Sequence, residues 1–230
     1  MKTIGLLGGM SWESTVLYYQ LLNEGVRERI GGLHSAKILM HSVDFAEIEQ
    51  FQVNGQWQEA GNKLADAALG LERSGADMVL ICTNLMHKVA PIIESQIKVP
   101  LLHIADAAGS TIKAQGLKKI GLLGTRYTME EDFYRKRLLD NFDLDVIIPD
   151  PEDREYIHQI IFHELCQGKF TDESRQNYLA IINKLRDKGA EGVILGCTEI
   201  PLLVRQEDTD LPLFNTGALH AQYALEHAFA

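Results

Sequence analysis

The fold is indicated most clearly by the stretch Gly189-Ala190-Glu191-Gly192-Val193-Ile194-Leu195-Gly196-Cys197-Thr198-Glu199. It is a short apolar run, typical of a buried strand, that ends at a thiol. The carboxyl end of such a run is where α/β proteins place their ligands. An earlier stretch, Gly75-Ala76-Asp77-Met78-Val79-Leu80-Ile81-Cys82-Thr83-Asn84, repeats the pattern. Alignment on Gly-Ala makes Thr83 the counterpart of Cys197, whereas Cys82 aligns with Gly196. The sequence therefore predicts two related strand ends, one with a hydroxyl and one with a thiol.

Two further markers extend this repeat to the whole chain. Lys2-Thr3-Ile4-Gly5-Leu6-Leu7-Gly8 recurs as Lys118-Lys119-Ile120-Gly121-Leu122-Leu123-Gly124, and Pro100-Leu101-Leu102 recurs as Pro212-Leu213-Phe214. The three pairs of markers keep their order and nearly their spacing. The chain therefore looks like a duplication of one half-length unit.

Each half alternates short apolar strands with helical patterns, which is typical of a parallel sheet wrapped by helices. We therefore expect an α/β fold of two similar domains, 1–115 and 116–230, with the terminal helix 216–230 able to pack on either. Right-handed crossovers bring the carboxyl ends of all strands of a sheet to one edge. If the halves face each other, the strand-end motifs converge on a cleft between the domains. These motifs are Gly8–Ser11, Thr83–Leu85, Gly124–Tyr127 and Cys197–Glu199.

Composition narrows the class of protein. The 230 residues carry a net charge of −10, which argues against nucleic-acid or anionic-membrane partners. Three cysteines at unrelated spacings form neither a disulfide framework nor a metal site. We recognise no signal peptide and no apolar run long enough for a membrane helix, so the cytoplasm is the expected location.

The three cysteines are expected to differ in role. Cys82, within its strand, and Cys166, within a predicted helix, are interpreted as core residues. Cys197 stands where a strand gives way to a helix, whose N-terminus would favour a thiolate. Two facing strand ends can take a proton from one face of a carbon and return one to the other. Backbone N–H groups of Thr83–Leu85 and Cys197–Glu199 could hold a carboxylate as it becomes enolate-like. No phosphate-binding glycine fingerprint is present, so no cofactor is expected.

The motifs Gly8-Gly9-Met10-Ser11, Thr83-Asn84 with His87, and Gly196-Cys197-Thr198-Glu199 resemble the signatures of the aspartate/glutamate racemase family. The resemblance covers nearly the whole chain. It implies two α/β domains with pseudo-two-fold symmetry, an active site between them, no cofactor, an amino acid substrate and a homodimer. Relatives carry a cysteine at both strand ends, whereas this chain has Thr83 at the first.

A threonine hydroxyl is far less acidic than a thiol, so Thr83 is suited to delivering or relaying a proton. The hypothesis is that Cys197 as thiolate deprotonates the L-enantiomer of aspartate or glutamate and that Thr83 protonates the opposite face. Cys82 as the base would need a register shift, and strand alternation turns it to the other face. The resemblance suggests supporting or substrate-binding roles for Met10, Ser11, Gln52, Asn84, Leu85, His87, Lys169, Thr198 and Glu199.

Other readings remain open at this point. Arylmalonate decarboxylases resemble the scaffold with only the second cysteine, whereas hydantoin racemases and maleate isomerases keep both. Each of three supporting residues also has an interpretation without a role in the reaction. Glu199 is equally interpreted as a carboxylate at a helix N-terminus, His87 as a hydrogen-bonded histidine, and Lys169 as a surface lysine. A two-lobed binding protein without chemistry is the alternative from another class.

Overall fold

The computed structural model describes all 230 residues, which form two compact units. Unit 1 comprises Met1–Ile104 and Gly217–Ala230, and unit 2 comprises Ala105–Thr216. In chain order the elements up to the first crossing between units are β1 (Ile4–Gly8), α1 (Trp12–Ile30), β2 (Ile38–Ser42), α2 (Phe45–Val53), α3 (Trp57–Arg73), β3 (Met78–Ile81), the 3₁₀ helix η1 (Leu85–Val89), α4 (Ala90–Glu94) and β4 (Leu101–Leu102). The remaining elements are α5 (Ile104–Ala114), β5 (Lys119–Gly124), α6 (Arg126–Glu130), α7 (Asp132–Phe142), β6 (Asp145–Ile147), α8 (Pro151–His163), η2 (Leu165–Gln167), α9 (Asp172–Asp187), β7 (Val193–Gly196), α10 (Ile200–Leu203), η3 (Gln206–Asp208), β8 (Leu213–Asn215) and α11 (Thr216–Phe229).

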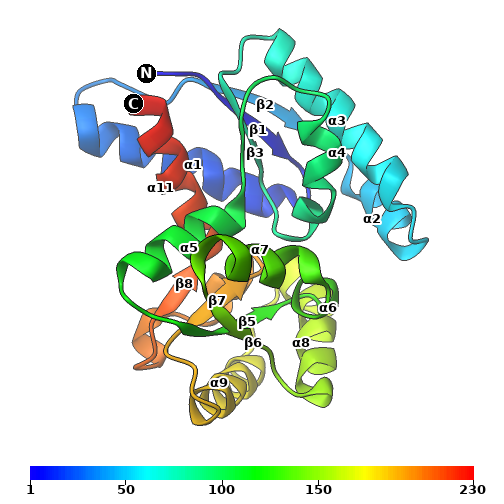
Figure 1. Cartoon of the computed structure of the whole chain (residues 1–230), viewed down its shortest axis with the longest axis vertical. Helices are drawn as coiled ribbons and strands as arrows, with labels where there is room; N and C mark the ends of the chain where they lie inside the picture. The colour runs from blue at the N-terminus through cyan, green and yellow to red at the C-terminus, as the bar shows by residue number, and fades with distance from the viewer. The chain divides into compact units, whose positions relative to one another are not determined.

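Both units contain a four-stranded, all-parallel sheet with helices around it, which confirms the predicted α/β class (Figure 1). The strand order is β2-β1-β3-β4 in unit 1 and β6-β5-β7-β8 in unit 2, so the two halves share one topology. The central pairs also share their register, because Gly5 lies opposite Val79 and Gly121 lies opposite Val193. The duplication predicted from the sequence is therefore present in the fold.

In each unit a carboxylate that stands shortly before the third strand binds the backbone at the start of the first strand. Asp77 accepts a hydrogen bond from the backbone N–H of Thr3 at 2.6 Å. Glu191 accepts from the N–H groups of Lys118 and Lys119 at 2.6 and 2.9 Å. These bonds lower the pKa of Glu191 below its ordinary value. Both units therefore use a carboxylate to accept the backbone N–H groups at the start of their first strand.

Strands β1, β3 and β4 of unit 1 are buried on both faces, as is usual in a parallel sheet, whereas the edge strand β2 is partly exposed. Alternate residues of β1 and β3, such as Leu6 and Leu80, form a core cluster with Tyr18 of α1 and Leu225 of α11. The opposite face meets α3, since a Cβ on Gly5 would lie 3.5 Å from Leu71 Cβ of that helix. Helix α11, red in Figure 1, lies beside α1.

Each half of the chain gives its last helix to the other unit. Apart from its first residue, helix α5 belongs to unit 2, and apart from its first residue, α11 belongs to unit 1. The division by contacts therefore falls after Ile104 and after Thr216, and differs from the continuous ranges 1–115 and 116–230. In this division residues Gly217–Ala230 of the terminal helix belong to unit 1.

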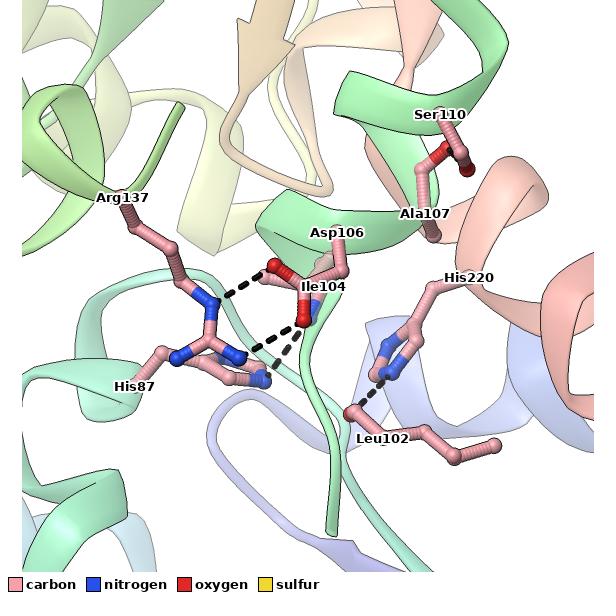
Figure 2. A network of polar contacts seen from close by, with 8 residues as sticks. All are labelled: His87, Leu102, Ile104, Asp106, Ala107, Ser110, Arg137 and His220. Atoms are coloured by element: carbon pink, nitrogen blue, oxygen red, sulfur yellow. Dashed lines mark hydrogen bonds and ion pairs between the residues drawn. The ribbon is translucent and has the colours of Figure 1, made fainter. Parts of the chain in front are cut away.

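Polar contacts hold both exchanged helices, a buried set in unit 1 and a part-buried ion pair in unit 2 (Figure 2). His220 of α11 binds the hydroxyl of Tyr18 at 2.8 Å through Nδ1 and the carbonyl of Leu102 at 2.7 Å through Nε2. Arg137 of α7 donates two hydrogen bonds of 2.6 Å to the carboxylate of Asp106 in α5. Such paired Arg–carboxylate contacts fix orientation as well as adding energy. None of the helices combines the length and apolar character needed to cross a bilayer.

Candidate active site

The glycine loop after β1 is held against the start of α1. Gly9 has a φ of +93°, and a Cβ there would lie 2.3 Å from the Val43 carbonyl oxygen, so only glycine fits. Its N–H donates to Thr15 Oγ1 at 2.9 Å, and the same hydroxyl donates to the Ser11 carbonyl at 3.0 Å. Met10 and Ser11, the predicted substrate contacts of this loop, are buried.

Strand β3 ends with its cysteine turned inward and its threonine turned outward. Cys82 is fully buried in the core cluster with α1 and α11, and burial raises the pKa of its thiol well above the ordinary range. Thr83 is partly exposed. The alternation that the sequence predicted therefore holds, and Cys82 is a core residue. Asn84 and Leu85, which follow in the turn, are buried.

Two side chains that do not belong to this turn hold its carbonyl groups. Ser14 Oγ lies 3.1 Å from the Cys82 carbonyl oxygen and 3.0 Å from that of Ser11. His87 Nδ1 lies 2.8 Å from the Thr83 carbonyl oxygen. Ser14 therefore ties the glycine loop to the strand end, a contact that the sequence analysis missed. No sequence pattern around position 14 signals this contact, because Ser14 and Cys82 are 68 residues apart in the chain.

Gln52 lies beside the 3₁₀ helix that follows this turn. Its side chain is buried, and Nε2 lies 3.1 Å from the sulfur of Met86. The structure thus brings five predicted residues of unit 1 (Met10, Ser11, Thr83, Asn84 and Leu85) to neighbouring strand ends, with Gln52 and His87 packed around them. No group of three or more His, Cys, Asp or Glu side chains is arranged to hold a metal ion.

The end of β7 places a thiol against a carboxylate. Cys197 Sγ donates to Glu199 Oε2 at 2.9 Å, and Thr198 Oγ1 donates to the same oxygen at 3.0 Å. All three side chains are buried, and Cys197 is 8% exposed. Gly196, directly before the thiol, leaves no room for a side chain, because a Cβ there would lie 2.8 Å from the Leu123 carbonyl oxygen.

The protonation of Cys197 differs from the expected thiolate. Burial raises the pKa of the thiol, and the neighbouring Glu199 carboxylate raises it further. The backbone N–H of Glu199 acts in the opposite direction, since it favours the thiolate. Burial and the carboxylate together outweigh it, so the pKa of the thiol stays above its ordinary value. Cys197 is therefore a thiol that donates to Glu199.

The remaining predicted residues of unit 2 lie after α8. Lys169 is exposed, and its ammonium group donates to Gln167 Oε1 at 3.0 Å. Cys166 is partly exposed in the 3₁₀ turn η2, so its interpretation as a buried cysteine inside a helix was wrong. The helix ends at His163 because Glu164 leaves helical geometry, with φ −123° and ψ −68°.

A family model described as "Asp/Glu/Hydantoin racemase" matches residues 7–224. The chain belongs to this family. Its structure resembles that of a candidate Asp/Glu racemase from Yersinia pestis, with 53% identity, a TM-score of 0.95 and complete coverage of both chains. An aspartate racemase homologue from Pyrococcus horikoshii is 35% identical, with a TM-score of 0.87 and complete coverage of both chains. The broad specificity amino-acid racemase RacX of Bacillus subtilis is 25% identical over 71% of this chain and 70% of its own length.

Membership of the family and the racemases among the relatives identify this protein as an isomerase, an amino-acid racemase. The fold expected from the sequence resemblance is confirmed by the same comparisons.

Proposed function

We propose that this racemase inverts the α-carbon of L-aspartate and L-glutamate without a cofactor, with Cys197 and Thr83 as the two proton-transfer groups. The observation that carries the proposal is the hydrogen bond of 2.9 Å from the Cys197 thiol to Glu199. Glu199 can accept the thiol proton, and Cys197 can then act as the base that removes the α-proton. Thr83 occupies the equivalent strand end of unit 1 and is partly exposed.

The proposed reaction begins at the thiol. Glu199 takes the thiol proton, and the Cys197 thiolate then takes the α-proton, so that an S–H bond forms as the C–H bond breaks. The electron pair moves into the α-carboxylate, which becomes enolate-like and is stabilised by nearby N–H donors. Thr83 gives its hydroxyl proton to the opposite face of the carbon and takes one from solvent. Glu199 returns its proton to solvent, which restores both groups.

Lys169 is proposed to bind the side-chain carboxylate of the substrate. Its ammonium group is exposed and has only a neutral amide oxygen, that of Gln167, as its hydrogen-bond partner. Lys169→Gln should raise KM for aspartate and glutamate and leave KM for an uncharged amino acid substrate unchanged. Equal effects on both substrate classes would contradict this role.

The test of the proposed function is exchange of the α-proton in D₂O, followed by NMR for L- and D-aspartate and for L- and D-glutamate. Wild-type protein should exchange the α-proton of the L-enantiomers faster than that of the D-enantiomers. Cys197→Ala should abolish exchange, and Thr83→Cys should raise turnover of the D-enantiomers. Release of carbon dioxide from an aryl malonate without amino acid exchange would instead identify a decarboxylase.

We further propose that the protein works as a homodimer in the cytoplasm. A catalytic thiol and two other free cysteines favour a reducing compartment, and the dimer rests on the family resemblance alone. Light scattering of the purified protein should give twice the 25.8 kDa mass of the chain, and a monomer mass would refute the dimer.

A further inference from the structure

Two consecutive carbonyl groups in the turn after β3 are each held by a buried side chain. Ser14 Oγ lies 3.1 Å from the Cys82 carbonyl oxygen, and His87 Nδ1 lies 2.8 Å from that of Thr83. Both side chains are only 1% exposed. The backbone N–H of His87 also donates to the Asn84 carbonyl at 3.2 Å. The carbonyls of Cys82 and Thr83 are thus turned toward buried side chains, and that of Asn84 is bonded within the following 3₁₀ turn.

The direction of a carbonyl fixes the direction of the next N–H. In a trans peptide the C=O and the following N–H lie in one plane and point opposite ways. Ser14, by holding the Cys82 carbonyl, therefore orients the N–H of Thr83. His87, by holding the Thr83 carbonyl, orients the N–H of Asn84. The Thr83 N–H itself donates to no acceptor in the chain, so it is available to a ligand.

We propose that Ser14 and His87 are positioning residues that aim the N–H groups of Thr83 and Asn84 at the carboxylate of the substrate. Neither side chain touches that carboxylate. Successive backbone N–H donors in a turn are a common way of binding an anion. The proposal rests on the proposed function only for the identity of the carboxylate, which is the α-carboxylate of the amino acid.

The hydrogen bonds of His87 fix its role as a donor. The backbone N–H of Ile104 donates to Nε2 at 3.2 Å, so Nε2 carries no hydrogen (Figure 2). Nδ1 must then carry the hydrogen that binds the Thr83 carbonyl. With both ring nitrogens engaged by backbone groups, the imidazole is a neutral tie between the strand-end turn and the start of α5. A proton-shuttling role would require one of these bonds to break.

Ser14 adds a second connection to the same turn. Its single hydroxyl hydrogen is shared between the carbonyls of Ser11 and Cys82, which lie at 3.0 and 3.1 Å. The glycine loop and the donor turn are therefore held in one arrangement. Loss of this hydroxyl should loosen the turn on the Cys82 side, and loss of the imidazole should loosen it on the Thr83 side.

Three variants separate positioning from mere packing. Asparagine at position 87 can place an amide N–H where Nδ1 stands, whereas the longer glutamine places its amide nearer to Nε2. Ser14→Ala and His87→Gln should lower kcat for α-proton exchange about tenfold, since donor pairs of this kind act mainly on the transition state. His87→Asn should retain most of the activity. Ser110→Ala is the matched control, because Ser110 Oγ binds only a carbonyl of its own helix, that of Ala107, at 3.1 Å.

An independent readout uses succinate, an unreactive dicarboxylate, titrated against ¹⁵N-labelled protein. The amide signals of Thr83 and Asn84 should shift in the wild type, in His87→Asn and in Ser110→Ala. The shifts should be weaker in Ser14→Ala and His87→Gln. Thermal unfolding of every variant checks that it is folded, and if Ser14→Ala is not, the two His87 variants carry the comparison.

The outcomes distinguish the two proposals. Responsive amides in a wild type that exchanges no α-proton would refute the racemase substrates and leave the positioning role supported. Exchange with unresponsive amides would refute the positioning role alone, as would equal shifts and equal kcat for His87→Asn and His87→Gln. Absence of both exchange and shifts would refute both proposals.

Discussion

Glu199→Gln should lower the pKa of the Cys197 thiol. The substitution removes the negative charge 2.9 Å from Sγ but keeps an oxygen that can accept the thiol hydrogen. Two unit charges at this distance repel by about 1.4 kcal/mol even with the full screening of water, which corresponds to about one pKa unit. The site is buried, so its screening is weaker and this value is a lower limit. Desolvation remains in the variant, so the pKa stays above that of an exposed thiol.

The assay is the rate of alkylation by iodoacetamide as a function of pH, with the Cys197 peptide quantified by mass spectrometry. Only the thiolate reacts, so the pH midpoint reports the pKa. A Cys166→Ser background removes the partly exposed competitor. Glu199→Gln should react at least about tenfold faster than wild type at neutral pH. Glu207→Gln, at a carboxylate whose side chain is 70% exposed, is the control and should leave the rate unchanged. An unchanged or higher midpoint in Glu199→Gln would refute the electrostatic reasoning.

Three further predictions concern stability. Tyr18→Phe should cost about 1–3 kcal/mol in urea unfolding, because it leaves Nδ1 of buried His220 without its partner at 2.8 Å; an unchanged midpoint would contradict this. Gly9→Ala should lower Tm strongly, since its Cβ would lie 2.3 Å from the Val43 carbonyl at a positive φ; a Tm equal to wild type would show that the loop moves freely. The folded-state pKa of Cys82 is raised above its unfolded value, so the native thiol keeps its proton where the unfolded chain has lost it. The free energy of unfolding should therefore fall as pH rises above about 8.5, and more shallowly in Cys82→Ala; parallel pH profiles would refute this linkage.

The sequence was sufficient to predict most of the fold and the two strand ends. Strand alternation and the internal repeat together assigned Cys82 to the core and Thr83 to the partly exposed side, and the structure has both in those places. Strand alternation and the repeat can both be recognised in the sequence without knowledge of tertiary contacts. The shared strand order of the two sheets follows from the same repeat.

Contacts between distant segments could not be read in the same way. Ser14 reaches the carbonyl of Cys82 only because α1 packs beside β3, and no pattern around position 14 encodes this. The protonation of Cys197 also escaped prediction. The position of Cys197 between a strand and a helix favours a thiolate. Its protonation state depends, however, on burial and on the side chain of Glu199, whose carboxylate lies 2.9 Å from the sulfur.

The local sequence likewise does not determine whether the last helix of each half packs on its own unit or on the other unit. Helices α5 and α11 follow the equivalent strands β4 and β8, so either pairing satisfies the sequence pattern. Only the complete set of contacts assigns each to the other unit.

The exchange of α5 and α11 has a consequence for the ancestry of the chain. A half-length ancestor built on this plan would have left the core cluster of its own sheet uncovered on the side where α11 now packs. It could have been completed only by the last helix of a second copy. In this chain the same exchange takes place within one polypeptide, and the two equivalent strand ends carry Thr83 in unit 1 and Cys197 in unit 2.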